Sequence, residues 1–122
     1  MQKKERVLKA NDLKRMIKRK CTISRRNCVK YWGRTSRDHF LVMCQICFKL
    51  AENGWEFFTE AEGVNDKWRA DIVAIHGDVG QIIEVLHTES EERYMKKKDT
   101  YPSEFILRGV RTKDFKIEEF DI

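Results

Sequence analysis

Apolar residues recur at three- and four-residue steps between residues 36 and 51, and this spacing predicts a helix. Ser36 suits the N-cap, and Asn53-Gly54 suits the C-terminal end. Leu41 and Phe48 make other sides of the helix apolar, which places it at the centre of the fold. The expected buried face consists of Phe40, Met43, Cys44, Cys47 and Leu50.

Strand-like segments follow, in which β-branched and aromatic residues partly alternate with polar ones between turn-forming residues. Three strands joined by short turns predict a β-meander, and a second helix and a fourth strand come after it. The tail is expected to add a short edge strand. The expected ranges are 55–62, 68–76 and 81–87 for the meander, 89–99 for the helix, 104–110 for the fourth strand and 115–122 for the tail. This order predicts an α/β fold with a mixed sheet of four or slightly more strands, flanked by helices.

The N-terminal third differs from the rest in charge. Residues 1–37 hold 14 Lys and Arg against 2 acids, a local net charge of +12, whereas residues 38–122 carry −7. Residues 4–20 resemble a basic helix, and residues 21–35 resemble a loop. We therefore divide the chain into a basic helical arm and loop over 1–35 and an α/β domain over 36–122.

A basic arm joined to an acidic body indicates a polyanionic partner, and nucleic acid is the best candidate. Trp32 lies in Lys30-Tyr31-Trp32-Gly33-Arg34, where aromatic and basic residues interleave, as suits stacking on bases. Packing of Trp32 on the body, and a solvated helix without a ligand, are the alternatives. The expected phosphate contacts are Lys14, Arg15, Lys18, Arg19, Arg25 and Arg26.

The composition suits one soluble domain. The chain has 122 residues, no apolar run near the ~20 that a membrane span needs, and a charged N-terminus. We therefore expect a cytoplasmic protein with no membrane partner and with reduced cysteines. Cys44 and Cys47 have the spacing of half a zinc site, with Cys21 and Cys28 to complete it. Their apolar helical setting favours buried thiols over a zinc-stabilised interaction module.

Two acidic residues interrupt segments that otherwise resemble buried strands. Asp71 lies in Arg-Ala-Asp-Ile-Val-Ala, and Glu84 lies in Ile-Ile-Glu-Val. Burying a carboxylate is costly unless something pairs with it. If the two strands pair antiparallel, both acids approach on one face near one end and can share a cation. The alternative pairs Asp71 with Arg69 or Arg93, and places Glu84 in a buried salt bridge.

The segment from residue 36 to about 110 resembles the PD-(D/E)XK nuclease superfamily, especially its small archaeal Holliday junction resolvase-like members. The resemblance lies in the opening helix, in Gly-Trp-Glu-Phe-Phe-Thr-Glu and in the two acidic motifs. It implies a restriction-endonuclease-like fold in which Asp71 and Glu84 bind Mg²⁺ or Mn²⁺, with Glu60 or Asp38 as a further carboxylate. It also implies a DNA partner and a homodimer.

The chain departs from that family at one catalytic position. The family's lysine, two residues beyond the glutamate, is Leu86 here. We expect Thr88 or Lys96 to replace it, and His39 to act beside the site as an acid/base or as a phosphate contact. The first hypothesis is a metal-dependent DNA endonuclease with resolvase-like activity. The second, which Leu86 favours, is a non-catalytic nucleic-acid-binding protein on the same scaffold.

Overall fold

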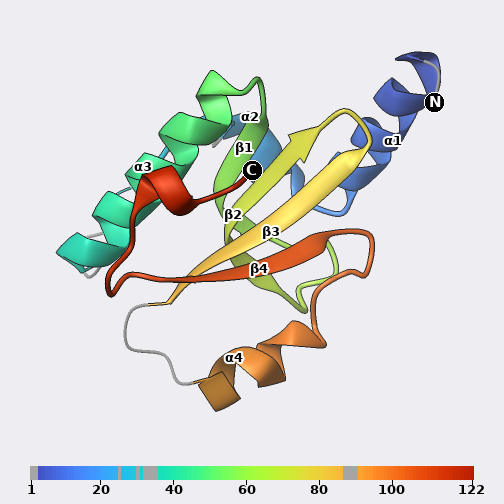
Figure 1. Cartoon of the computed structure of the whole chain (residues 1–122). Coiled ribbons are helices and arrows are strands. Elements are labelled where there is room, and N and C mark those ends of the chain that lie inside the picture. The colour runs from blue at the N-terminus through green and yellow to red at the C-terminus, as the bar shows by residue number, and fades with distance from the viewer. Residues whose placement is uncertain (1–2, 25, 30, 32–35, 87–90) are drawn as a thin grey trace.

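The structure is a computed structural model that describes residues 3–24, 26–29, 31, 36–86 and 91–122 (Figure 1). It is an α/β fold in which helices pack on a four-stranded mixed sheet, as the sequence predicts. The elements are α1 (Lys3–Arg15), α2 (Arg19–Ser24), α3 (Arg37–Glu52), β1 (Glu56–Glu62), β2 (Arg69–His76), β3 (Val79–Leu86), α4 (Glu91–Lys98), β4 (Ile106–Arg111) and the 3₁₀ turn η1 (Ile117–Glu119).

The strands lie in the order β1-β2-β3-β4. β1, β2 and β3 pair antiparallel, which confirms the predicted meander. β4 pairs parallel with β3 and is reached through a crossover that contains α4, since a parallel pair cannot be joined by a tight turn. The C-terminal ends of β3 and β4 therefore lie next to each other, at the same end of the sheet.

Helices cover both faces of the sheet, and each face has its own hydrophobic core. In Figure 1, α3 and α1 lie on opposite sides of the strands. The core under α3 includes Met43, Ile46, Leu50, Ile72 and Ile83. The core on the other face includes Leu13, Ile17, Phe58, Val73 and Ile82.

α3 begins and ends where its sequence predicts, but it is not central. The Ser36 hydroxyl accepts the His39 amide at 3.1 Å as the N-cap, and Gly54 leaves the helix with φ +78°. Leu41 and Phe48 are 47% and 68% exposed, so the prediction of a helix buried on several sides is wrong. α3 covers one face of the sheet and is therefore amphipathic. Its buried residues are Val42, Met43, Ile46, Cys47 and Leu50, whereas Phe40 and Cys44 are half-buried.

The predicted helix over 4–20, with a loop after it, is also wrong. α1 ends at Arg15 because the chain then joins the sheet, where Ile17 forms a β-bridge with Gly63. α2 follows at Arg19–Ser24. Leu13, Ile17 and Cys21 are each at most 3% exposed, so the described part of residues 1–35 shares a core with the sheet.

The tail forms the turn η1 where an edge strand was predicted, so that prediction is wrong. Phe115 and Phe120 contact each other, with ring centroids 6.2 Å apart, and pack on the core under α3. In an extended strand, residues five positions apart would point to opposite faces. The Lys49 ammonium also donates to the main-chain oxygens of Ile117 (3.2 Å) and Phe120, which holds the turn against α3.

Candidate functional site

β2 and β3 stop pairing at the level of Asp71 and Glu84. The last cross-strand pair of their ladder is Ile72 with Ile83, so Asp71 and Glu84 occupy the next level. At this point the Val85 amide donates to Asp71 Oδ2 at 2.8 Å. A side-chain oxygen thus replaces a main-chain acceptor, and it fixes the Asp71 carboxylate at the fork between the strands.

Glu84 is 5% exposed and Asp71 is half-buried, and the two carboxyl groups lie close enough to interact as a hydrogen-bonding pair. Burial, reinforced by the negative charge of Asp71, raises the pKa of Glu84 to about 9. Burial alone would raise the pKa of Asp71 too, but the hydrogen bonds from His39 and the Val85 amide bring it below the ordinary value. Near neutral pH the pair therefore carries one negative charge and one proton.

His39 and Tyr101 approach this pair from different elements. His39 lies in the first turn of α3, and its Nε2 is 3.4 Å from Asp71 Oδ2. The bond to Asp71 raises the pKa of His39, although burial opposes this. His39 Nδ1 is buried without a hydrogen-bond partner among the described residues. The Tyr101 hydroxyl lies 2.6 Å from Glu84 Oε1 and 3.1 Å from the main-chain oxygen of Arg69.

Glu60 lies on β1 at the same level. The pairs Thr59–Ile72 and Ala61–Ala70 flank it, so Glu60 is opposite Asp71. It has φ +50°, in the left-handed region, and is 9% exposed. Its carboxylate accepts Arg69 Nη2 at 2.9 Å. The structure therefore brings Glu60, Asp71 and Glu84 to one level of three adjacent strands.

Of the three acids, Asp71 and Glu84 interact directly with each other and can act together on one ligand. Within the described residues, no group of three or more His, Cys, Asp and Glu is disposed to hold a metal. The ion-pair partner of Asp71 is His39, whereas Arg69 pairs with Glu60. Any ion at this site would therefore be held mainly by Asp71 and Glu84.

A cavity of about 330 Å³ opens beside the pair, and cationic side chains surround it. Lys67, Arg69 and Lys97 line it together with Trp68 and Tyr101. The positive charge of Lys97 also acts to lower the pKa of Glu84. The cavity lining thus combines two acidic and three basic side chains.

The structure does not place either of the two residues predicted to replace the family's lysine at the cavity. Lys96 is exposed, does not line the cavity and lies 3.8 Å from Glu92. Lys97, one position later, lines the cavity instead. Thr88 lies outside the described residues.

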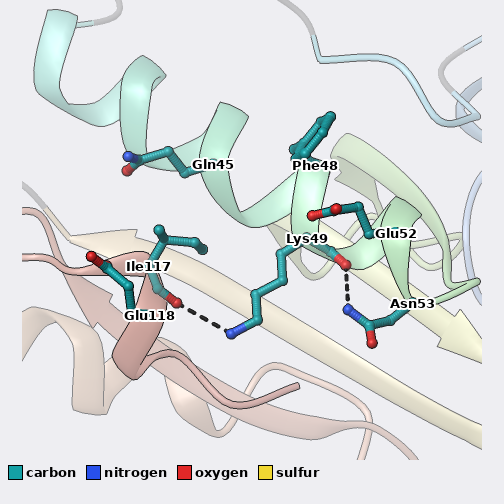
Figure 2. Close-up of a pocket in the computed structure, with 7 residues that line it drawn as sticks. All are labelled: Gln45, Phe48, Lys49, Glu52, Asn53, Ile117 and Glu118. Atoms are coloured by element: carbon teal, nitrogen blue, oxygen red, sulfur yellow. Dashed lines mark hydrogen bonds between the residues drawn. The ribbon is translucent and has the colours of Figure 1, made fainter.

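A larger cavity of about 620 Å³ lies between α3 and η1 (Figure 2). Figure 2 shows that the ammonium of Lys49 is bound to the Ile117 carbonyl, while Asn53 donates to the main-chain oxygen of Lys49. These polar groups cap α3 and hold the tail. They do not converge on a common point as Asp71 and Glu84 do.

Most described residues of the predicted phosphate-binding arm face acidic partners within the protein. Lys14 and Arg26 pair with Glu56 at 3.1 and 3.5 Å. Lys18 pairs with Glu62 at 3.2 Å and with Asp66, while Arg15 pairs with Asp12 at 2.8 Å. Arg19 is exposed, and Arg25 and Trp32 lie outside the described residues.

The four cysteines are free thiols distributed over both faces of the sheet. Cys21 belongs to the core on the α1 face, whereas Cys47 belongs to the core under α3. Burial raises the pKa of the Cys47 thiol well above its ordinary value, which keeps it protonated. The sheet therefore separates the thiols that a four-cysteine zinc site would have to bring together.

The sequence gives no sign of Tyr101 and does not distinguish Lys97 from Lys96, because long-range packing rather than a local pattern brings Tyr101 and Lys97 to the carboxyl pair. Comparisons of the chain with protein-family models, curated proteins and solved structures gave no match. Among the helices in the described part of the chain, none has the length and apolar character that crossing a membrane requires.

Proposed function

We propose that the protein is a metal-dependent endonuclease that hydrolyses phosphodiester bonds, with DNA as its first expected substrate, on a restriction-endonuclease-like scaffold. One observation carries this proposal: the buried carboxyl group of Glu84 and the half-buried carboxyl group of Asp71 interact at the fork of β2 and β3. Glu84 forms no ion pair among the described residues, and its pKa is raised to about 9. A bound cation would supply the direct ionic partner that Glu84 does not have among the described residues.

The donor atoms suit a hard divalent cation. Both side chains offer oxygen, which Mg²⁺ and Mn²⁺ prefer, and Mg²⁺ commonly binds through one or two carboxylates plus water and substrate phosphate. Asp71 and Glu84 would hold the ion, and Glu60 remains a further candidate on the same level of the sheet. When bound, the ion would polarise the phosphate and lower the pKa of a coordinated water.

The surrounding residues suit a phosphodiester substrate. Lys67, Arg69 and Lys97 line the cavity and would bind non-bridging phosphate oxygens. His39 orients the Asp71 carboxylate through its Nε2, and Tyr101 orients Glu84 through its hydroxyl. Of these cations, Lys97 would take the electrostatic role of the family's lysine.

The test is a cleavage assay on labelled four-way junction, duplex and single-stranded DNA, and on RNA, with Mg²⁺ or Mn²⁺. Asp71→Asn and Glu84→Gln keep side-chain volume and should abolish cleavage. Asp78→Asn is the matched control, because Asp78 lies in the turn at the other end of the same hairpin. The absence of a divalent-dependent product from every substrate would overturn the endonuclease proposal.

A second candidate is a nucleic-acid-binding protein without catalysis. The observation that favours it is Leu86, which occupies the position of the family's lysine and is 4% exposed in the core. Such a protein would bind nucleic acid and show no cleavage for Asp71→Asn to remove. The same assay, run beside a binding measurement, separates the two candidates.

A further inference from the structure

A second cationic groove lies at the end of β4. It has a volume of about 320 Å³ and is formed by the last residues of β4 and the segment that leads to η1. Four cations and two acids line it: Arg108, Arg111, Lys113, Lys116, Asp114 and Glu119. The cationic excess makes the groove attractive to an anion.

One cationic side chain of this groove packs within the protein, whereas two others are exposed to solvent. The Arg108 guanidinium lies 4.2 Å from the centre of the Phe120 ring and donates to Gln81 at 3.2 Å, so it belongs to the packing of the tail. Lys113 and Lys116 are exposed and form no ion pair within the described residues. In contrast, Lys14 and Lys18 of the N-terminal segment are held by acids.

The groove adjoins the carboxyl pair through the β3–β4 ladder. Glu84 pairs with Gly109 and Leu86 pairs with Arg111, so Arg111 lies two residues beyond the level of Glu84 on the neighbouring strand. Strand spacing of about 4.8 Å and a rise of about 3.3 Å per residue place their Cα atoms roughly 8 Å apart. A nucleic-acid strand carries one phosphate per about 3.4 Å of helix axis, so the near end of the groove, at Arg111, lies about two nucleotides from Glu84.

We propose that the groove at the end of β4 binds backbone phosphates that flank the phosphate held at Asp71 and Glu84. The recognition is of phosphate charge by Lys113 and Lys116, and it is independent of base sequence. The role of the phosphate at Asp71 and Glu84 as the one that is cleaved rests on the proposed endonuclease function. The binding of a nucleic-acid backbone by the groove does not rest on it.

The test measures binding of labelled single-stranded and duplex DNA by the full chain in EDTA, across a range of salt concentrations. The double variant Lys113→Ala/Lys116→Ala should bind DNA about tenfold more weakly at low salt. Its plot of log K against log salt should be less steep, by about 2 in the magnitude of the slope. Lys113→Arg/Lys116→Arg should restore both values. The matched control, Lys4→Ala/Lys9→Ala, removes two exposed charges from α1.

Because EDTA prevents metal-dependent cleavage, this result is independent of the endonuclease proposal. An unchanged slope in the Lys113/Lys116 variant, with cleavage intact, would overturn the groove proposal alone. Equal losses in both double variants would attribute binding to overall charge and would also overturn it. Binding of poly-glutamate but not DNA at the groove would assign it to an acidic peptide and reject the nucleic-acid backbone.

Discussion

The Asp71 carboxylate accepts the main-chain amide of Val85 at 2.8 Å, one level beyond the last β2–β3 pair. Val85 directly follows Glu84, so this bond holds the two acidic side chains next to each other. Asp71 is kept charged by its hydrogen bonds, and burial together with this neighbouring charge keeps Glu84 protonated. The charge of Glu84 therefore depends on whatever positive group binds beside it.

Stability without metal should fall as the pH rises from 5 to 8. Unfolded Glu84 loses its proton near 4.5, whereas folded Glu84 keeps it to about 9. The unfolded state binds fewer protons in this window, so the free energy of unfolding decreases, by at most about 1.4 kcal/mol per pH unit from this group. Urea unfolding in EDTA at several pH values should show a shallower decrease for Glu84→Gln. Parallel curves for the two proteins would contradict the shifted pKa.

Mg²⁺ should stabilise the folded protein, and more so at pH 8 than at pH 6. The ion must displace the Glu84 proton, and displacement is easier when protons are scarce. Millimolar Mg²⁺ should raise the Tm by several degrees, which corresponds to about 1–2 kcal/mol. Thermal unfolding with and without Mg²⁺ measures this. The gain should persist in Asp78→Asn and vanish in Asp71→Asn, and a gain retained by Asp71→Asn would place the ion elsewhere.

Local sequence signals predicted the elements whose boundaries are set locally. The Ser36 cap and the Gly54 end of α3 depend on nearest neighbours, and the meander depends on alternation and short turns. The misassigned elements depend on distant contacts. Ile17 leaves the helical pattern to pair with Gly63, and Phe120 turns back onto the core under α3.

The candidate site was partly predictable for the same reason. Asp71 and Glu84 stand out as acids within apolar strands, and a short turn brings those strands together. The contribution of Tyr101 could not be anticipated, because it depends on how the segment after α4 packs on Arg69 and Glu84. Likewise Lys96 and Lys97 are adjacent in the sequence, and only the orientation of α4 determines which of them lines the cavity.

Glu60 offers a test of backbone strain at the site. A residue with a side chain at φ +50° adopts a conformation that costs about 1 kcal/mol and that glycine adopts freely. Glu60→Gly and Glu60→Ala both remove the ion pair with Arg69, but only glycine relieves the strain. Glu60→Gly should therefore be more stable than Glu60→Ala by about 1 kcal/mol in urea unfolding. Equal stabilities would show that the left-handed conformation at Glu60 stores no such strain.

Lys97 and Lys96 form a matched pair for testing the electrostatic role at the site. Lys97 lines the cavity and acts on Glu84, whereas Lys96 lies beside Glu92 on the exposed surface of α4. Lys97→Ala should lower kcat for DNA cleavage at least about tenfold, because a positive charge aimed at the transition-state phosphate is lost. Lys96→Ala removes the same charge one residue away and should change kcat less than about twofold, because Lys96 does not line the cavity and lies beside Glu92 on the exposed surface.

The same pair separates catalysis from binding. Both variants lose one charge, so their affinities for DNA in EDTA should fall by similar small factors, and the difference should be confined to kcat. Lys97→Arg should recover part of the rate because it restores the charge in the lining of the cavity. If Lys96→Ala lost as much kcat as Lys97→Ala, the orientation of α4 over Asp71 and Glu84 would not be the source of the effect. The electrostatic role assigned to Lys97 would then be rejected.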